Sequence, residues 1–163
     1  MIFSSLFNPF KKLQKLIEKG KYEDAMHLIF KYPNLSKQPN FMHLCAYSKD
    51  YDLISFALKY KPDFYTEEKY NPLHFLANIR KYDTSFENWD YALFADYPNE
   101  YLDYRKNPKQ LKFRSFDSKC ILLIDKKKKF MHEIGGIFAL SPIDICIRNL
   151  DVEGVRSFIK KGI

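Results

Sequence analysis

The sequence predicts an all-α protein, a solenoid of about four helix-turn-helix repeats with one inserted segment, and three observations carry this prediction. A short helix-start motif occurs three times, apolar residues follow it at helical spacing, and the first repeats recur at a nearly constant interval. Its 163 residues have the length of one ordinary domain, so we expect a single domain over 1–163. A composition of 46% hydrophobic residues with only 5 Gly is that of a folded chain.

The start motif has a physical reason to begin a helix. A small polar residue precedes Pro or an aromatic residue, then come an apolar residue, a His or Asp, and closing apolar residues. Asn71 or Ser141 can cap the free backbone N–H groups, and Pro72 or Pro142 can take the first helical position, where its missing donor costs nothing. We therefore expect a helix at each of the three copies, NFMHLCA (40–46), NPLHFLA (71–77) and SPIDICI (141–147).

A polar turn and a second amphipathic helix follow each start, and a first repeat near residues 11–35 has the same two helices without the motif. The turn positions are 29, 31 and 70 residues apart, at Gly20, Lys49, Arg80 and Leu150. The third interval equals one repeat plus an insertion of roughly 35 to 40 residues. Gly162 is placed to end the last helix. This register predicts six residues buried between helix pairs: Leu16, Leu28, Leu53, Leu73, Ile143 and Phe158.

These motifs resemble the ankyrin repeat family, whose repeats start with T-P-L-H-x-A-A and recur about every 33 residues. The resemblance covers about 11–83 and 138–163, with NPLHFLA at 71–77 as its strongest match. It departs from the family where Lys49, Arg80 and Leu150 replace the turn glycine. The resemblance implies that His43 and His74 have a structural role, through hydrogen bonds to the backbone of neighbouring loops.

The insertion, at about 84–137, divides into an acidic and a basic half. Residues 83–103 carry six acids and no Lys or Arg, whereas 104–129 carry ten bases against two acids. We expect a helix from Thr84 or Ser85, with Phe86 and Trp89 on one face, to supply the second helix of the third repeat. In the basic half we expect a β-hairpin with strands at 121–124 and 130–134 and the lysine run 126–129 at its tip.

A search for catalytic chemistry gives no catalytic, cofactor-binding or metal-binding residue. The sequence has no Walker A, GxGxxG, HExxH or GxSxG motif. Its three cysteines, Cys45, Cys120 and Cys146, are far apart and are expected to be reduced and mostly buried. We therefore expect a protein that is not an enzyme and has no small-molecule substrate.

The chain also lacks the patterns of membrane insertion and export. No run approaches the roughly 18 apolar residues that cross a bilayer. The apolar start of the chain lacks a preceding basic region and is interrupted at Pro9, which argues against a cleaved signal peptide. We expect a cytoplasmic protein without a membrane partner.

Recognition of another protein is the function that these features favour, through the concave face of the repeats and the inserted finger. Interface energies are dominated by Tyr, Trp and Arg, and a net charge of +7 suits a partner with an acidic surface. The resemblance suggests a bacterial immunity or antitoxin protein, and alternatively a secreted ankyrin effector or a viral host-interaction protein. Nucleic-acid binding is disfavoured, because an acidic segment lies beside the basic one. The predicted partner-binding residues are Trp89, Tyr97, Tyr101, Tyr104, Arg105, Lys126, Lys127, Lys128 and Lys129.

Overall fold

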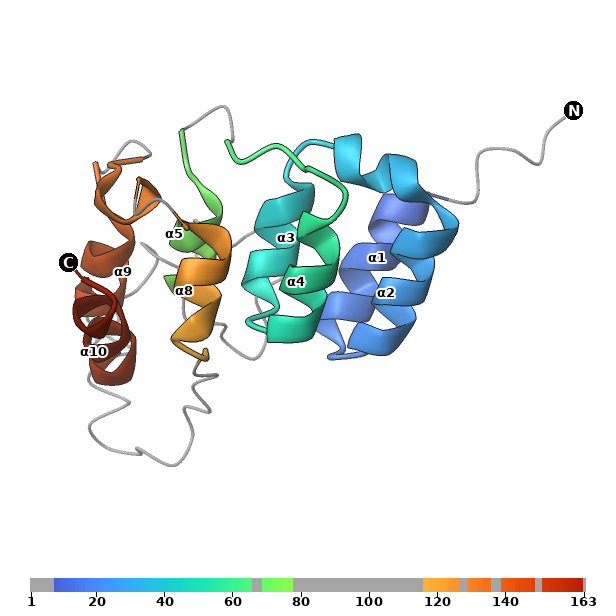
Figure 1. Ribbon diagram of the computed structural model, residues 1–163. Helices are drawn as coiled ribbons and strands as arrows, with labels where there is room; N and C mark the ends of the chain where they lie inside the picture. Colours follow the sequence, from blue (N-terminus) through green and yellow to red (C-terminus); the bar gives the residue numbers. More distant parts are fainter. Residues whose placement is uncertain are drawn as a thin grey trace, which may run out of the picture.

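The protein is all-α, and its helices stand in pairs along a row (Figure 1). The computed structural model describes residues 8–65, 69–77, 116–126, 129–135, 139–148 and 151–162. The helices that come first in their pairs are α1 (Pro9–Glu18), α3 (Phe41–Tyr47), α5 (Pro72–Ala77) and α9 (Pro142–Arg148). Their partners are α2 (Tyr22–Lys31), α4 (Tyr51–Leu58), α8 (Lys119–Ile124) and α10 (Val152–Lys160). Two 3-10 helices, η1 (Pro33–Lys37) and η3 (Phe130–His132), lie in connections between pairs.

Contacts between the helices run both within and along the row. Helix α1 packs against α2, α3 against α4, α5 against α8 and α9 against α10. The first helices also touch in sequence, α1 with α3, α3 with α5 and α5 with α9, while α2 packs on α4 and α4 on α8. Each pair therefore buries one face against the next, and the core is continuous from α1 to α10.

The helix starts form as the sequence predicts. Helices α5 and α9 begin at Pro72 and Pro142. The Asn71 Oδ1 atom accepts the backbone N–H of Leu73 at 2.9 Å. Ser141 and Asp144 bond reciprocally, because Asp144 Oδ2 accepts the Ser141 N–H at 2.8 Å and Ser141 Oγ accepts the Asp144 N–H at 3.3 Å. This reciprocal pair satisfies N–H groups that a helix start otherwise leaves unpaired.

Lys49 takes the position that Gly20 has in the first pair. Both residues have left-handed backbones, with φ of 71° at Gly20 and 60° at Lys49, a region that normally favours glycine. The buried Lys49 ammonium donates to the carbonyl oxygen of Leu76, at the end of α5, and lies 5.5 Å from the ring centroid of Phe116, just before α8. This side chain links the second pair to α5 and to the segment that leads into α8, a gain that accounts for a lysine at a strained position.

The predicted core is confirmed at four of six positions. Leu28, Leu53, Leu73 and Phe158 are buried. The other two, Leu16 and Ile143, are only partly buried and pack against the edge of the core.

The β-hairpin prediction is wrong. Residues 121–124 belong to helix α8, and residues 130–132 form η3. Among the described residues, the only strand-like pairing is an isolated antiparallel bridge between Gly135 and Leu140. Helix α8 buries Cys120, Ile121 and Ile124, a helical spacing that favours a helix once α4 and α5 supply a surface to cover that side.

Helix α8 is also the helix that packs beside α5. The predicted partner helix, which starts at Thr84 or Ser85 in the acidic half, lies outside the described residues. No helix in the described part of the chain is long and apolar enough to cross a membrane.

Candidate functional site

Two long connections between helix pairs lie on the same edge of the row, at the top in Figure 1. One joins α4 to α5 and the other joins α8 to α9. We call their described parts, residues 61–65, 69–70, 125–126 and 129–135, the finger edge. Rigid helices fix where each connection leaves and returns, so the finger edge is a surface held by the fold.

Two buried histidines tie these connections to the helices. His43 Nε2 bonds the carbonyl oxygen of Tyr70 at 2.9 Å, and His74 Nε2 bonds that of Leu140 at the same distance. His74 Nδ1 accepts the backbone N–H of Asn71 at 3.1 Å, so its proton is on Nε2, which donates. Burial lowers the pKa of both imidazoles, that of His43 to about 4, and each stays neutral near pH 7.

Asp125 organises the connection after α8. Its side chain is buried, and its two carboxylate oxygens accept three backbone N–H groups, from Lys129 at 2.7 Å, Phe130 at 2.7 Å and Met131 at 3.0 Å. Hydrogen bonds to a carboxylate are stronger than those between neutral groups. The Asp125 side chain therefore starts η3 and fixes the backbone from which the Lys129 side chain projects.

Aromatic side chains join the two connections. The Phe64 and Phe130 rings are stacked with centroids 5.5 Å apart, and Tyr65 meets Phe130 edge-on at 5.8 Å. The Lys129 ammonium lies 5.9 Å from the Tyr65 ring centroid and 5.8 Å from that of Phe130. Tyr65 is 41% exposed and Lys129 is exposed, so this cation and ring face solvent together.

Hydrogen bonds also hold the cluster of Tyr65, Lys129 and Phe130 in place. Tyr65 Oη donates to Glu133 Oε1 at 3.0 Å, while Asn71 Nδ2 donates to Glu133 Oε2 at 3.1 Å and to the Phe130 carbonyl at 3.0 Å. Partial burial and the bond to Glu133 raise the pKa of Tyr65, so the phenol keeps its proton at neutral pH. A Cβ on Gly135 would come within 2.9 Å of the Lys69 carbonyl oxygen, and so this close approach of the two connections requires glycine.

The carboxylates and the lysines of the finger edge have different surroundings. All three of its described carboxylates accept internal hydrogen bonds: Asp63 from the N–H groups of Phe64 and Tyr65, Asp125 from η3, and Glu133 from Tyr65 and Asn71. The lysines of this edge, by contrast, are exposed: Lys61, Lys69, Lys126 and Lys129. The described residues of this edge thus carry four lysines against three carboxylates, so the surface that a partner meets is weakly cationic and in part aromatic, with Ile134, 61% exposed, beside it.

The predicted partner-binding residues divide into two groups. Lys126 and Lys129 lie exposed on the finger edge, in the α8–α9 connection. The remaining seven lie outside the described residues: Trp89, Tyr97, Tyr101, Tyr104, Arg105, Lys127 and Lys128.

The α4–α5 half of the site was not among the predicted binding residues. Tyr65 and Phe64 contact Phe130 across more than sixty residues of sequence, which no local pattern shows. A partial signal was present in the run PDFY at 62–65, because Pro and Asp favour a turn and the two aromatic residues follow them directly.

The cysteines, the other side chains that could react, are buried. Cys45, Cys120 and Cys146 are buried, and burial raises the pKa of each thiol, to about 12 for Cys120 and Cys146. Thiols in that state are poor nucleophiles. In the part of the chain that the structure describes, no cluster of three His, Cys, Asp or Glu side chains could hold a metal ion.

A scan against protein-family models and a search of the curated proteins both find no match to this chain. What the finger edge can bind therefore follows from its own residues. Ammonium groups beside aromatic rings, on a frame fixed by buried hydrogen bonds, attract a carboxylate and an apolar side chain together.

Proposed function

We propose that this protein is a small ankyrin-type repeat protein whose function is to bind another protein, without catalysis, through the finger edge. The repeat proposal is supported by two rows of helices in contact, by the three start motifs, and by the equivalent bonds of His43 and His74 to the following connection. Stacked repeats present a rigid surface, so that little conformational entropy is lost on binding.

The observation that carries this proposal is the cluster of Tyr65, Lys129 and Phe130. It combines an aromatic anchor with a cation in a solvent-facing position, and Asp125 and Glu133 hold it in place. Preorganised anchors of this type dominate binding energy at protein interfaces. The concave face of the repeats belongs to the same proposal, and the other predicted binding residues of the insertion lie outside the described residues.

The partner that this surface suits has an acidic patch with apolar residues. Lys126 and Lys129 supply the attraction over distance, while Tyr65 and Ile134 supply apolar area on contact. Nucleic acid suits it less, because the Phe130 ring is already stacked on Phe64 and is not available to a base on that side.

Neutralisation of a toxin-like protein is the form of this function that we propose first. A rigid surface can block a partner's site by covering it and needs no cofactor. A toxin-like gene directly beside the coding gene would support an immunity role, whereas a requirement for translocation into a host cell would support the effector alternative.

The test is capture of the partner from the native cell, with identification by mass spectrometry. Three forms of the full chain are compared: wild type, the double variant K126E/K129E, and the control K19E/K21E. The control reverses two exposed lysines at the α1–α2 turn, on the opposite edge of the row from the finger edge in Figure 1. We expect wild type and control to retain the same protein and the finger variant to lose it.

Equal capture by all three forms would contradict the proposal that the finger edge binds. If nucleic acid is retained instead, its affinity should fall linearly on a log–log plot against salt, and K126E/K129E should reduce that slope. That outcome would replace the protein-binding proposal.

A further inference from the structure

Helices α2 and α4 have an open groove between them. The two helices pack against each other and lie side by side in Figure 1. The groove has two adjoining parts, of about 380 Å³ and about 490 Å³, which share Glu23 and Met26. It extends from the turn before α2, on the opposite edge of the row from the finger edge, to the side chain of Phe30. The groove is therefore separate from the proposed binding surface.

The first part of the groove is largely apolar. Met26 and Phe30 of α2 line it together with Phe56 of α4. Residues four apart share a face of a helix, so Met26 and Phe30 present one apolar strip. Phe30 is 73% exposed, more than any other large apolar side chain in the described part of the chain. Phenylalanine is a residue that proteins usually bury, and its exposure here calls for a reason.

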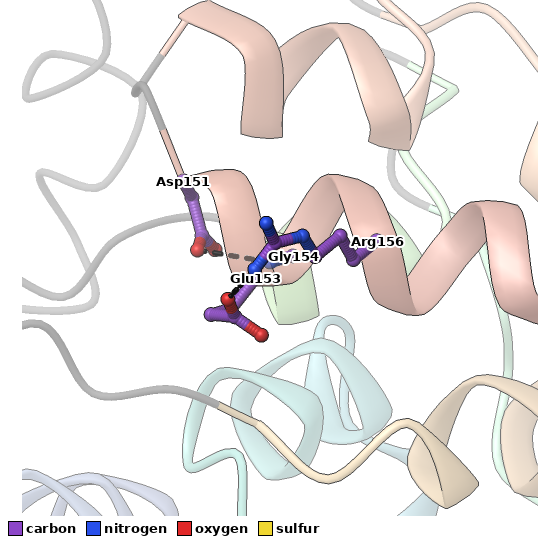
Figure 2. Close-up of polar contacts among 4 residues, drawn as sticks. All are labelled: Asp151, Glu153, Gly154 and Arg156. Carbon is purple, nitrogen blue, oxygen red and sulfur yellow. Dashed lines mark hydrogen bonds and ion pairs between the residues drawn. The ribbon is translucent and has the colours of Figure 1, made fainter.

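The position of Phe30 can be compared with the same position in two other pairs. Helices α4 and α10 align through their caps, because Asp50 and Asp151 each accept the N–H of the third residue on at 2.9 Å. Figure 2 shows Asp151 and its bond at the start of α10. The left-handed Gly20 and Lys49 align α2 with α4 in turn.

This alignment places Phe30 where α4 has Lys59 and α10 has Lys160. Both lysines are exposed, so the position faces solvent in all three pairs. The second pair has neighbours on both sides, and the exposure of the position is thus not an effect of the end of the row. Packing within the chain does not account for an aromatic ring at Phe30, which indicates a surface that another molecule covers.

The second part of the groove is acidic. Its charged side chains are four carboxylates and one ammonium, from Glu23, Asp24, Asp50, Asp52 and Lys21. The side chains of Glu23, Asp24 and Asp52 are exposed and form no ion pair with another described residue. The helix dipole favours acids in a first turn, but it does not account for the apolar strip that adjoins them. The groove is thus locally negative in a chain of net charge +7.

We propose that this groove binds a basic amphipathic segment of another protein. Its apolar side chains would cover Phe30 and Met26, and its lysine or arginine side chains would meet the carboxylates. Charge complementarity selects this occupant, because an acidic segment would be repelled at Glu23 and Asp52. From Asp24 to Phe30 the helix rises about 9 Å, so a helical segment would carry its basic and apolar residues one to two turns apart.

Fluorescence anisotropy of the full chain with a labelled peptide tests this groove. The probe is a peptide of leucine and lysine at helical spacing, and its control has glutamate in place of every lysine. At physiological salt, charges more than about 8 Å away are largely screened. We expect the lysine peptide to bind at least about tenfold more tightly than the glutamate peptide, although the net charge of the chain favours the reverse order.

Three variants locate the binding of the lysine peptide. F30K gives α2 the residue type that α4 and α10 have at this position and should weaken binding at least about tenfold. The matched control I134K adds the same charge on the finger edge and should leave the affinity unchanged. E23Q/D52N removes two charges of the groove and should weaken binding about threefold or more.

F30K should keep the circular dichroism and melting temperature of the wild type, because the replaced side chain is exposed. Equal affinity of wild type and F30K, or a preference for the glutamate peptide, would overturn the proposal. Self-association of the wild type that F30K abolishes would also overturn it, by making a second copy the occupant. The capture test of the finger edge is read from other residues and another partner, so its result does not depend on this one.

Discussion

His74 donates from Nε2 to the carbonyl oxygen of Leu140, 2.9 Å away and 66 residues later in the chain. Its other ring nitrogen accepts the N–H of Asn71, which fixes the tautomer that can donate. The imidazole thus joins the start of α5 to the point where the α8–α9 connection returns to α9. The position of the finger edge depends on this buried bond, although the histidine itself does not face solvent.

His74→Ala should lower stability and leave binding intact. The substitution leaves the buried N–H of Asn71 and the partly buried carbonyl of Leu140 without their partner, which costs about 1–3 kcal/mol in the free energy of unfolding. Urea denaturation measures this loss, with the exposed His27→Ala as control. Partner affinity lost with no loss of stability would show that His74 belongs to the binding surface.

His43 should make the protein less stable as the pH falls. Its pKa is about 4 in the folded protein and 6.5 in a free chain, because burial disfavours the charged ring. Between pH 6.5 and 4 the unfolded chain binds a proton at this residue that the folded protein does not. The free energy of unfolding therefore falls across this window, by on the order of 3 kcal/mol at its acid end.

The variant His43→Gln isolates this contribution, because glutamine can donate to Tyr70 but does not titrate. Urea midpoints measured from pH 7.5 to 4.5 should fall less steeply for the variant than for the wild type. Identical slopes would mean that His43 titrates normally. His74, whose pKa burial also lowers, keeps part of the slope in both proteins.

Asp125→Ala should disorder the connection after α8. Three backbone N–H groups lose a charged acceptor, and we expect a cost of about 2–4 kcal/mol. Asp125→Asn should cost less, because its carbonyl oxygen still accepts. Asp24→Ala, at an exposed position of α2, provides the comparison. If Asp125→Ala were as stable as Asp24→Ala, the carboxylate would not be organising η3.

The loss of stability on truncating an apolar side chain should depend on how deeply that side chain is buried, and not on its position in the start motif. Leu73→Ala removes a fully buried side chain and should cost about 2–5 kcal/mol. Ile143 is the equivalent residue of the last pair but is only partly buried, so Ile143→Ala should cost clearly less. Chemical denaturation of both variants checks the order, and equal costs would place Ile143 in the core.

The helix pairs were predictable because their signals are local. Asn71, Pro72 and Gly162 mark helix ends through their own backbone and side-chain chemistry, and the structure has them in those roles. Helix α8 was predicted as a strand because a run of four apolar residues, ILLI, suits either form. Contacts of α8 with α4 and α5 favour the helix, and these contacts cannot be predicted from a short window of sequence.

The site was predictable in charge but not in construction. The exposed lysines at 126 and 129 follow from composition, since a lysine-rich run rarely lies in a core. The role of Asp125 and the stacking of Phe64 on Phe130 depend on how two distant connections approach each other. Only the fold brings these residues together.

The association rate of the captured partner tests the central claim, binding through the cationic finger edge, most directly. Surface-based kinetics would compare the wild type with K126E/K129E and with the control K19E/K21E, at low and physiological salt. We expect the finger variant to associate at least about tenfold more slowly, and the wild-type rate to fall as salt rises while the control behaves as wild type. An unchanged rate for K126E/K129E would contradict the account and leave these lysines as solvated surface.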